Sequence, residues 1–375
     1  MLEIKGSGGS ATLEATSTSS VGSAGICVSS ENGSASLNIS GGTDVTARNT
    51  AHYWGGYGVY LNSWGDNPIP PTNLTVDGGS LTASGATNGI YSQYNGGNSS
   101  DNGTLNLTVS NNAVVRAENG IGKNGNNSSV NYQTDGANGG IVFDGGNGTV
   151  YGNVTLQDDL TIGEGESLTV PEGSRLNTNG KLTVNGGTLT GIERITGTVK
   201  YAPTITTTSL TEGTVGTAYS QILAAMGDMP ITWSVSGGSL PGGLSLSSDG
   251  KITGTPTDAG EFSFTVTADN NSGSDSKEFS LSVGQATPQA TDFTFTAPTD
   301  LVYDGNAKYA TVTAKEGIVG MGEITVIEYY DEDGNLLTDA PVNAGVYTVK
   351  IDAAKGDNYT AVTDLTDNTW KFTIE

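Results

Sequence analysis

The chain of 375 residues contains 56 Gly, has 34 % hydrophobic residues and carries a formal net charge of −24. This charge repels phosphate backbones, which excludes nucleic acid as an expected partner, and no stretch approaches the roughly 20 apolar residues of a membrane span. The single cysteine (Cys27) excludes an internal disulfide, and the single histidine (His52) excludes His-rich metal sites and most catalytic triads, so we expect no metal or cofactor.

A repeated pattern occupies the first third of the chain. A Gly followed by a branched apolar residue recurs at Ile26, Val59, Ile90 and Ile121, with spacings of 59−26 = 33, 90−59 = 31 and 121−90 = 31 residues. A second pattern has nearly the same spacing and places two apolar residues before a Gly or Asn turn: Leu2/Ile4, Leu37/Ile39, Leu74/Val76 and Leu107/Val109. Each repeat supplies at least two short strands and cannot bury its apolar face alone. We therefore predict a stacked solenoid with the four Gly-following residues in one interior column.

The spacing of the alternating apolar segments changes in the later part of residues 1–200. Three short alternating segments follow one another at intervals of 14 residues: Val154-Thr-Leu156, Leu168-Thr-Val170 and Leu182-Thr-Val184. We interpret them as shorter legs that close the solenoid. The repeated GI…L-x-I-x-G-G pattern resembles the right-handed parallel β-helices of secreted gut-bacterial and clostridial proteins, including a β-helical carbohydrate-binding family. The resemblance implies a right-handed parallel β-helix over residues 1–200.

A second block is expected over residues 201–285. Its strand-like runs are separated by Gly, Pro and Asp turns, as in a small antiparallel sandwich: Gln221–Ala225, Ile231–Ser236, Leu244–Ser247, Phe262–Ala268 and Glu278–Val283. The segments Leu240-Pro-Gly-Gly-Leu244 and Gly250-Lys-Ile-Thr-Gly254-Thr-Pro256 closely resemble an Ig-like, cadherin-like domain of bacterial surface proteins. That family implies a β-sandwich that acts as a spacer or stalk module.

A third block is expected over residues 286–375. Its strand-like runs are Phe293–Thr296, Ala310–Ala314, Ile324–Tyr330, Gly345–Ile351 and Trp370–Ile374. The segment Tyr303-Asp304-Gly305 and the run from Val342 to Tyr347 resemble the YDG/MBG-type Ig-like repeats of bacterial surface proteins. The predicted fold class is thus all-β, a right-handed parallel β-helix followed by two Ig-like β-sandwich domains.

Aromatic residues are unusually concentrated near residue 60. Residues 52–64 hold five aromatic rings plus His52, in a chain that is only 7 % aromatic. Tyr60 and Tyr91 each directly follow a predicted interior residue, so both rings should point outward and stack on adjacent coils. Exposed rings beside Asn and Ser suit the apolar face of a sugar. The candidate carbohydrate-binding residues are Trp54, Tyr57, Tyr60, Trp64, Tyr91 and Tyr94. The alternative is a structural role, either as an aromatic ladder that fills a loop flap or with Trp54 and Trp64 buried under the Pro68–Pro71 insertion.

The sequence gives no credible acid–base pair, so we expect no catalysis. Basic residues such as Arg116 are scattered with no Asp cluster nearby, and we interpret Asp158-Asp159, Glu164 and Glu166 as turn residues. The segment from Asp331 to Asn335 lacks the downstream Glu of a calcium loop, which favours a hairpin turn.

These observations favour a non-catalytic bacterial protein at the cell surface or in the extracellular space. Its β-helix would bind polysaccharide, host glycan or matrix, and the Ig-like modules would act as spacers. Two alternatives are a polysaccharide lyase or hydrolase on a β-helix scaffold and a ligand-free structural stalk. Because Leu2 and Ile4 already match the repeat, we also expect the chain to be part of a longer exported protein.

Overall fold

The computed structural model describes residues 2–5, 12–17, 24–31, 34–49, 56–64, 71–95, 103–124, 128–135 and 138–375. Their regular elements are all strands, apart from two 3₁₀ turns at Ile192–Arg194 and Ala290–Asp292. The chain divides into two compact units, residues 1–203 with 271–273 and residues 204–270 with 274–375. Within the described ranges, no helix has the length and apolarity to cross a membrane. The all-β prediction is confirmed at this level.

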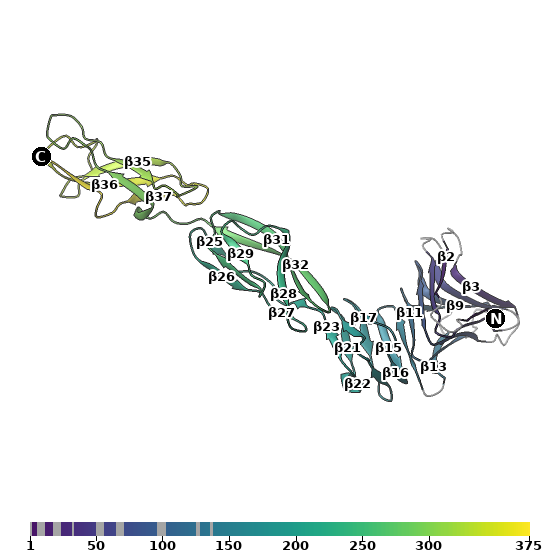
Figure 1. The fold of residues 1–375 in the computed structure, drawn as a ribbon. Coiled ribbons are helices and arrows are strands. Elements are labelled where there is room, and N and C mark those ends of the chain that lie inside the picture. The colour runs from purple at the N-terminus through teal and green to yellow at the C-terminus, as the bar shows by residue number, and fades with distance from the viewer. Residues whose placement is uncertain are drawn as a thin grey trace. The chain divides into compact units, whose positions relative to one another are not determined.

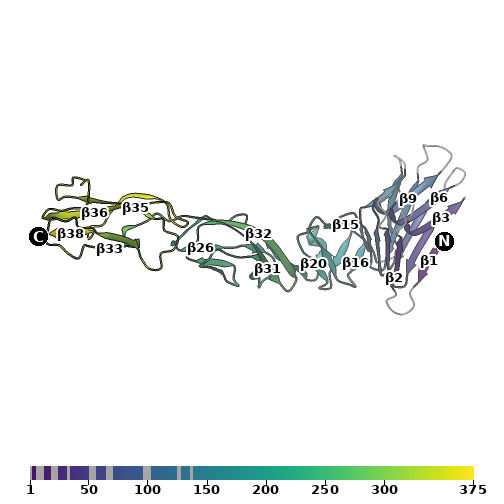
Figure 2. The ribbon, with the colours of Figure 1, turned by 90° about the horizontal axis from the view of Figure 1, so that it is seen from above.

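The first unit begins with three parallel sheets that the chain visits in turn (Figures 1 and 2). The first sheet contains β1 (Leu2–Lys5), β4 (Ser36–Ser40), β7 (Thr72–Asp77), β10 (Thr104–Ser110) and β13 (Ser129–Thr134). The second begins with β2 (Thr12–Ser17), β5 (Asp44–Asn49), β8 (Ser80–Ser84), β11 (Ala113–Ala117) and β14 (Gly140–Asp144). The third contains β3 (Ala24–Glu31), β6 (Tyr57–Trp64), β9 (Asn88–Asn95) and β12 (Ile121–Lys123). Each complete repeat thus supplies three strands.

The predicted interior column lies in the third sheet. Ile26 pairs with Val59, Val59 with Ile90, and Ile90 with Ile121, which confirms the register expected from the repeat. Ile26, Val59 and Ile90 are buried. Since alternate side chains of a strand point to opposite faces, a constant register stacks every second residue in the core.

The chain reverses direction at the end of the first stack. Strand β15 (Asn147–Tyr151) pairs antiparallel with β14 across a turn that contains Gly145, whose φ is 61°. Both faces of β14 are buried, with Val142 in the core of the first stack and Ile141 and Phe143 in a second core. Because neighbouring residues of a strand face opposite sides, the two cores lie on opposite faces of the same sheet.

A second stack of parallel strands follows the reversal. Its strands continue the second sheet and form two further sheets: β15, β18 (Ser167–Thr169) and β21 (Thr188–Thr190); β16 (Asn153–Thr155), β19 (Arg175–Asn177) and β22 (Ile195–Thr196); β17 (Leu160–Ile162), β20 (Leu182–Val184) and β23 (Val199–Tyr201). Val154, Leu168 and Leu182 lie in three different sheets, so the predicted legs do not stack on one another at the 14-residue interval. Val154 pairs with Leu176, which is 176−154 = 22 residues onward.

Two stacked tyrosines, Tyr132 and Tyr151, lie at the end of the first stack. Tyr132 follows Leu107 in the register of the first sheet, and its ring stacks on that of Tyr151 with centroids 5.1 Å apart. Both rings pack against the first core. Beside them, the Asp144 carboxylate accepts a hydrogen bond of 2.7 Å from the backbone N–H of Ile121, in the last strand of the third sheet.

The second unit contains two hydrophobic cores. The strands around the first core are β24 (Thr204–Ile205), β25 (Gly213–Thr214), β26 (Tyr219–Ile222), β27 (Ala225–Met226), β28 (Thr232–Gly238), β29 (Leu244–Leu246), β30 (Lys251–Gly254), β31 (Gly260–Asn270) and β32 (Gly273–Gly284). The two predicted motifs meet here, since Leu244 pairs with Gly254 and the Thr255 N–H donates to the Gly243 carbonyl. A Cβ on Gly243 would lie 2.0 Å from the Thr255 oxygen, so this close approach requires glycine.

The strands around the other core are β33 (Phe293–Thr296), β34 (Thr311–Ala314), β35 (Ile324–Tyr330), β36 (Gly345–Ala353), β37 (Val362–Leu365) and β38 (Lys371–Ile374). All five predicted strand runs of this block are present within a few residues, whereas β37 was not predicted. The predicted hairpin turn is confirmed: the Asp331 carboxylate accepts bonds from the backbone N–H groups of Asp333 and Asn335, and Tyr330 pairs with Leu336.

Candidate functional site

Three predicted tyrosines gather on the third sheet of the first stack. Tyr60 pairs with Tyr91 in the register of β6 and β9, as predicted, and their rings stack with centroids 6.2 Å apart. Tyr57 joins them, with its ring 4.3 Å from that of Tyr91 at 6° and 5.4 Å from that of Tyr60 at 15°. All three side chains are half-buried. The structure therefore forms a tyrosine cluster (Tyr57, Tyr60 and Tyr91) on one side face of the stack.

The rings of this tyrosine cluster cover one another rather than lying flat on the surface. The rings of Tyr57 and Tyr91 are nearly parallel and in stacking contact, so the facing sides of these two rings are closed to a ligand. The prediction of flat rings that are open to solvent is therefore corrected to stacked, half-buried rings. Because all three side chains are only half-buried, part of the cluster remains accessible to a sugar.

Residues on both sides of the cluster define its limits. Cys27 precedes Tyr60 in register, and Gly122 follows Tyr91. A Cβ on Gly122 would lie 2.6 Å from Cδ2 of Tyr91, so the absence of a side chain there leaves space for the ring. The Tyr60 hydroxyl donates a 2.5 Å hydrogen bond to Gln93. Burial, followed by the neighbouring Cys27, Tyr57 and Tyr91, raises the pKa of Tyr60 to about 12.

Tyr94 lies inside the stack and does not belong to the surface cluster. Only 5 % of its area is exposed, and its hydroxyl lies 2.9 Å from the hydroxyls of both Thr72 and Ser92, which are themselves buried. Its ring lies against Gly103, where a Cβ would come within 1.8 Å of Cδ2. The prediction that Tyr94 contacts carbohydrate is therefore wrong, because an interior hydrogen-bond network takes up its hydroxyl group. Strand alternation alone favours this outcome, since Tyr94 is an even number of residues from Ile90.

The side chains of the two predicted tryptophans lie outside the described part of the structure. Trp54 and His52 lie outside the described residues. Trp64 is the last residue of β6, and its backbone pairs with Glu31 and Asn95, but its side chain lies outside the described part.

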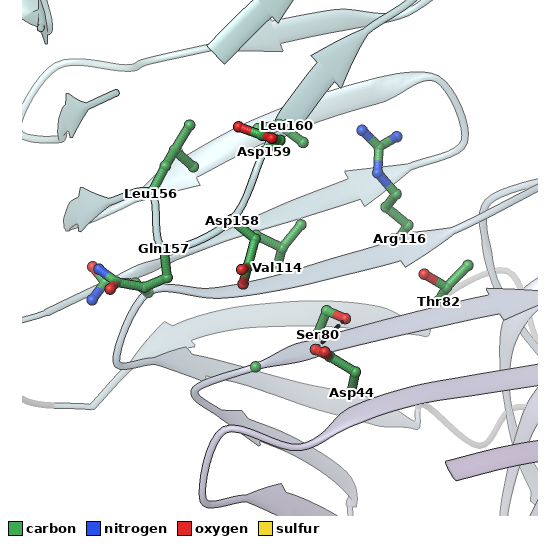
Figure 3. A pocket seen from close by; sticks show the side chains of 12 residues that line it. Asp44, Ser80, Thr82, Val114, Arg116, Leu156, Gln157, Asp158, Asp159 and Leu160 are labelled. Atoms are coloured by element: carbon green, nitrogen blue, oxygen red, sulfur yellow. Dashed lines mark hydrogen bonds between the residues drawn. The ribbon is translucent and has the colours of Figure 1, made fainter. Parts of the chain in front are cut away.

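A pocket that the sequence did not predict, with both polar and apolar lining residues, lies elsewhere in the first unit (Figure 3). It has a volume of about 230 Å³ and lies between the outward side chains of β5, β8 and β11 and the connection from β16 to β17. Asp44 and Ser80 line one side, Asp158 and Gln157 line the other, and Arg116 is also part of the wall. Asp44, Asp158 and Asp159 line the same pocket as Arg116, because the second stack folds over the outward face of β11.

Arg116 is held in place by two contacts from the second stack. Its Nη1 lies 2.6 Å from Oε1 of Glu166, and its Nη2 donates a 3.0 Å hydrogen bond to the Thr161 carbonyl. The turn residue Glu166 thus also forms an ion pair. Among the residues that the structure describes, no group of three or more His, Cys, Asp or Glu side chains is placed to hold a metal ion.

One family model matches part of the chain. Residues 202–284 match the family described as "Putative Ig domain". This match covers one of the two predicted Ig-like blocks and agrees with the resemblance seen in its sequence. None of the curated proteins compared with the chain matches it.

Similar solved structures share limited parts of the chain. One is a "putative alpha-galactosidase" from Bacteroides fragilis, with 28 % identity over 24 % of this chain and 19 % of that chain and a TM-score of 0.21. Another is a SusE-like, surface-located polysaccharide-binding protein from Bacteroides thetaiotaomicron, with 16 % identity over 45 % of this chain and 34 % of that chain and a TM-score of 0.23. A structure of Dscam has 14 % identity over 45 % of this chain and 48 % of that chain, with a TM-score of 0.20. The chain thus spans about a fifth of the length of the galactosidase, and scores this low carry no functional argument.

Proposed function

We propose that the protein is a non-catalytic, glycan-binding protein of a bacterial cell surface or extracellular space. The first unit is a right-handed parallel β-helix in this proposal, and the Ig-like domain together with the last block acts as a spacer. The ordered visits of the chain to three parallel sheets support the helix. The match of residues 202–284 to an Ig domain supports the spacer role.

The observation that carries the proposal is the tyrosine cluster. Interior positions bury apolar residues, whereas Tyr57, Tyr60 and Tyr91 place three half-buried, stacked rings on an outer face. Tyrosine offers both an apolar ring and a hydrogen-bonding hydroxyl, which is the combination that sugars require. Because some ring faces are closed by stacking, each contact is modest, and binding is expected to gain from several sugar units along the face.

Alanine replacement in the full chain tests this function. The double variant Tyr60→Ala/Tyr91→Ala should lose retention in affinity gels that contain a polysaccharide selected beforehand on a glycan array. Its melting temperature should stay within a few degrees, because both side chains lie outside the core. The control Tyr303→Ala/Tyr309→Ala removes two exposed tyrosines from the last block and should leave retention unchanged.

The same assays separate the alternatives. Unchanged retention in the Tyr60/Tyr91 variant would reject the tyrosine cluster as the binding site. Failure of the wild type to bind any glycan would favour the ligand-free stalk. Reproducible cleavage of a polysaccharide, abolished by changing one carboxylate or basic residue, would favour the lyase or hydrolase.

A further inference from the structure

We propose that the pocket between the two stacks is a subsite for a sugar residue that carries a free amino group. The choice of a sugar over another amine rests on the proposed function, while the pocket itself is separate from the tyrosine cluster. The pocket arises because the chain reverses at Gly145 and buries Ile141 and Phe143 on the outward face of the shared sheet. The connection from β16 to β17 then overhangs the outward side chains of β8 and β11, and a concave space remains between them.

The size of the pocket suits one small organic group. Its volume of about 230 Å³ corresponds to several water molecules at about 30 Å³ each. Concave sites of this kind bind ligands when a few polar groups converge on them. Here the lining combines the carboxylates of Asp44 and Asp158, the hydroxyls of Ser80 and Thr82, and the amide of Gln157. Such a mixture of donors and acceptors matches a polyhydroxylated ring.

The positions of the carboxylates favour a positive charge in the ligand. Figure 3 shows Asp158 on the connecting loop, on the side of the pocket opposite Asp44 and Ser80. The Asp44 carboxylate accepts a 2.8 Å hydrogen bond from the Ser80 hydroxyl, which fixes the orientation of the carboxylate on its side of the pocket. Both carboxylates would attract an ammonium group in the pocket, and charge-assisted hydrogen bonds to a carboxylate are the stronger ones.

The guanidinium of Arg116 does not cancel this preference. Its Nη1 pairs with Glu166 at 2.6 Å, and its Nη2 donates to the Thr161 carbonyl, so its charge is matched by a residue outside the pocket lining. The third carboxylate of the lining, Asp159, adds to the negative potential. A protein of net charge −24 also repels acidic sugars over a longer range. The geometry therefore selects against uronic acids and sulfated sugars.

The experiment compares two matched probes on the full chain by isothermal titration calorimetry. One is an oligosaccharide of β-linked glucosamine with free amino groups, and the other is the same oligosaccharide with N-acetylated amines. We expect binding of the amine form at least about tenfold tighter than that of the acetylated form, which corresponds to the loss of one or two charge-assisted bonds. Binding of the amine form should weaken at about 1 M salt, where the screening length is ~3 Å.

Variants with equal charge changes locate the site. Asp44→Asn/Asp158→Asn should weaken binding of the amine form at least about tenfold. Glu164→Gln/Glu172→Gln removes two exposed carboxylates outside the pocket and should leave it nearly unchanged. Equal weakening by both double variants, or no weakening by the pocket variant, would overturn the subsite, since general attraction by the acidic surface would then explain the binding.

The outcomes also separate this inference from the proposed function. Retention of neutral glycans through Tyr60 and Tyr91, without preferential binding of the amine form, would overturn the amino-sugar subsite alone. An amine preference that depends on Asp44 and Asp158 and persists in Tyr60→Ala/Tyr91→Ala would support the subsite even if the tyrosine cluster fails its own test. Binding of a lysine homopolymer that depends on the same two aspartates, with no binding of the amine oligosaccharide, would overturn the sugar assignment.

Discussion

The guanidinium carbon of Arg116 lies 4.0 Å from the centroid of the Phe143 ring. The two residues are neighbours in register on β11 and β14, and both stand on the face of the sheet where the second stack begins. Phe143 is fully buried in the second core, whereas about a quarter of the Arg116 side chain is exposed. Arg116 therefore covers the edge of the second core while it bonds to Glu166 and Thr161.

We predict that Arg116→Met destabilises the junction of the two stacks by about 1–2 kcal/mol. The variant loses a partly exposed ion pair, a hydrogen bond to a carbonyl and a cation–π contact, and retains only part of the aliphatic packing. Hydrogen exchange measured by mass spectrometry on the full chain should show faster exchange in β14 to β17. Arg175→Met, which changes an exposed arginine of β19, is the control. Equal protection in the Arg116 variant would contradict the role assigned to this contact.

We predict that Gly243→Ala costs about 3 kcal/mol or more in the block that matches the Ig family model. Gly243 has a φ of 82°, and a Cβ there would lie 2.0 Å from the Thr255 carbonyl oxygen, so backbone strain adds to a backbone clash. Gly216 is a matched control because it has a φ of 72° with nothing within 4 Å of a new Cβ. Gly216→Ala should cost only about 1 kcal/mol, from the unfavourable backbone conformation. Scanning calorimetry of both variants measures the difference, and similar melting temperatures would refute the explanation of the motif.

We predict that Tyr60 ionises well above the pH of an ordinary tyrosine. Its pKa is raised from 10.0 to about 12, mainly by burial and then by Cys27, Tyr57 and Tyr91. Because the folded pKa exceeds the unfolded value, the stabilisation is complete below about pH 10 and is lost as the pH rises toward about 12. An ultraviolet titration of tyrosinate should show that Tyr60→Phe removes a transition near this upper value. Tyr330→Phe removes a different high-pH transition, since the hydrogen bond to Glu328 first, then burial, raises the pKa of Tyr330 to about 12. If Tyr60→Phe instead removed a transition near pH 10.0, the ordinary value for tyrosine, the burial of this hydroxyl would be contradicted.

We predict that Asp304 stabilises the last block in a pH-dependent way. Hydrogen bonds from the Asn306 backbone and side chain, followed by Lys308, lower the pKa of Asp304 from 3.8 to about 2. Lys308 is buried and pairs with Asp304 at 3.0 Å and with Asp300 at 3.2 Å. The folded pKa lies below the unfolded value, so the stabilisation is present above about pH 4 and is lost as the pH falls toward 2.

Asp304→Asn should therefore lower the melting temperature of this block at neutral pH, and its difference from the wild type should shrink between pH 3.8 and about 2. Asp339→Asn, at an exposed position of the same block, serves as the control. A constant difference across this pH range would show that the ionised carboxylate is not what stabilises the turn.

The sequence alone determined the register of the first stack. A period of 31–33 residues fixes which branched apolar residues meet, and strand alternation then places Tyr60 beside Tyr91 on the opposite face. The sequence also predicted local turns correctly. Asp331 accepts hydrogen bonds from residues close to it in the chain, and the glycines around Leu244 lie at the pairing of two neighbouring strands. These features depend on short-range geometry, which each repeat or hairpin encodes by itself.

Only the tertiary structure decided how the first stack ends and what lies on its outer face. Ile141, Val142 and Phe143 are all apolar, so the sequence indicates burial on both faces of β14 but not which core each residue joins. The antiparallel pairing of β14 with β15 decides which core each of these residues joins. It also brings Glu166 to Arg116, which are 50 positions apart in the sequence. The pocket at Asp44 and Asp158 follows from the same reversal. No local pattern specifies such contacts, because they depend on which face of a shared sheet the later coils cover.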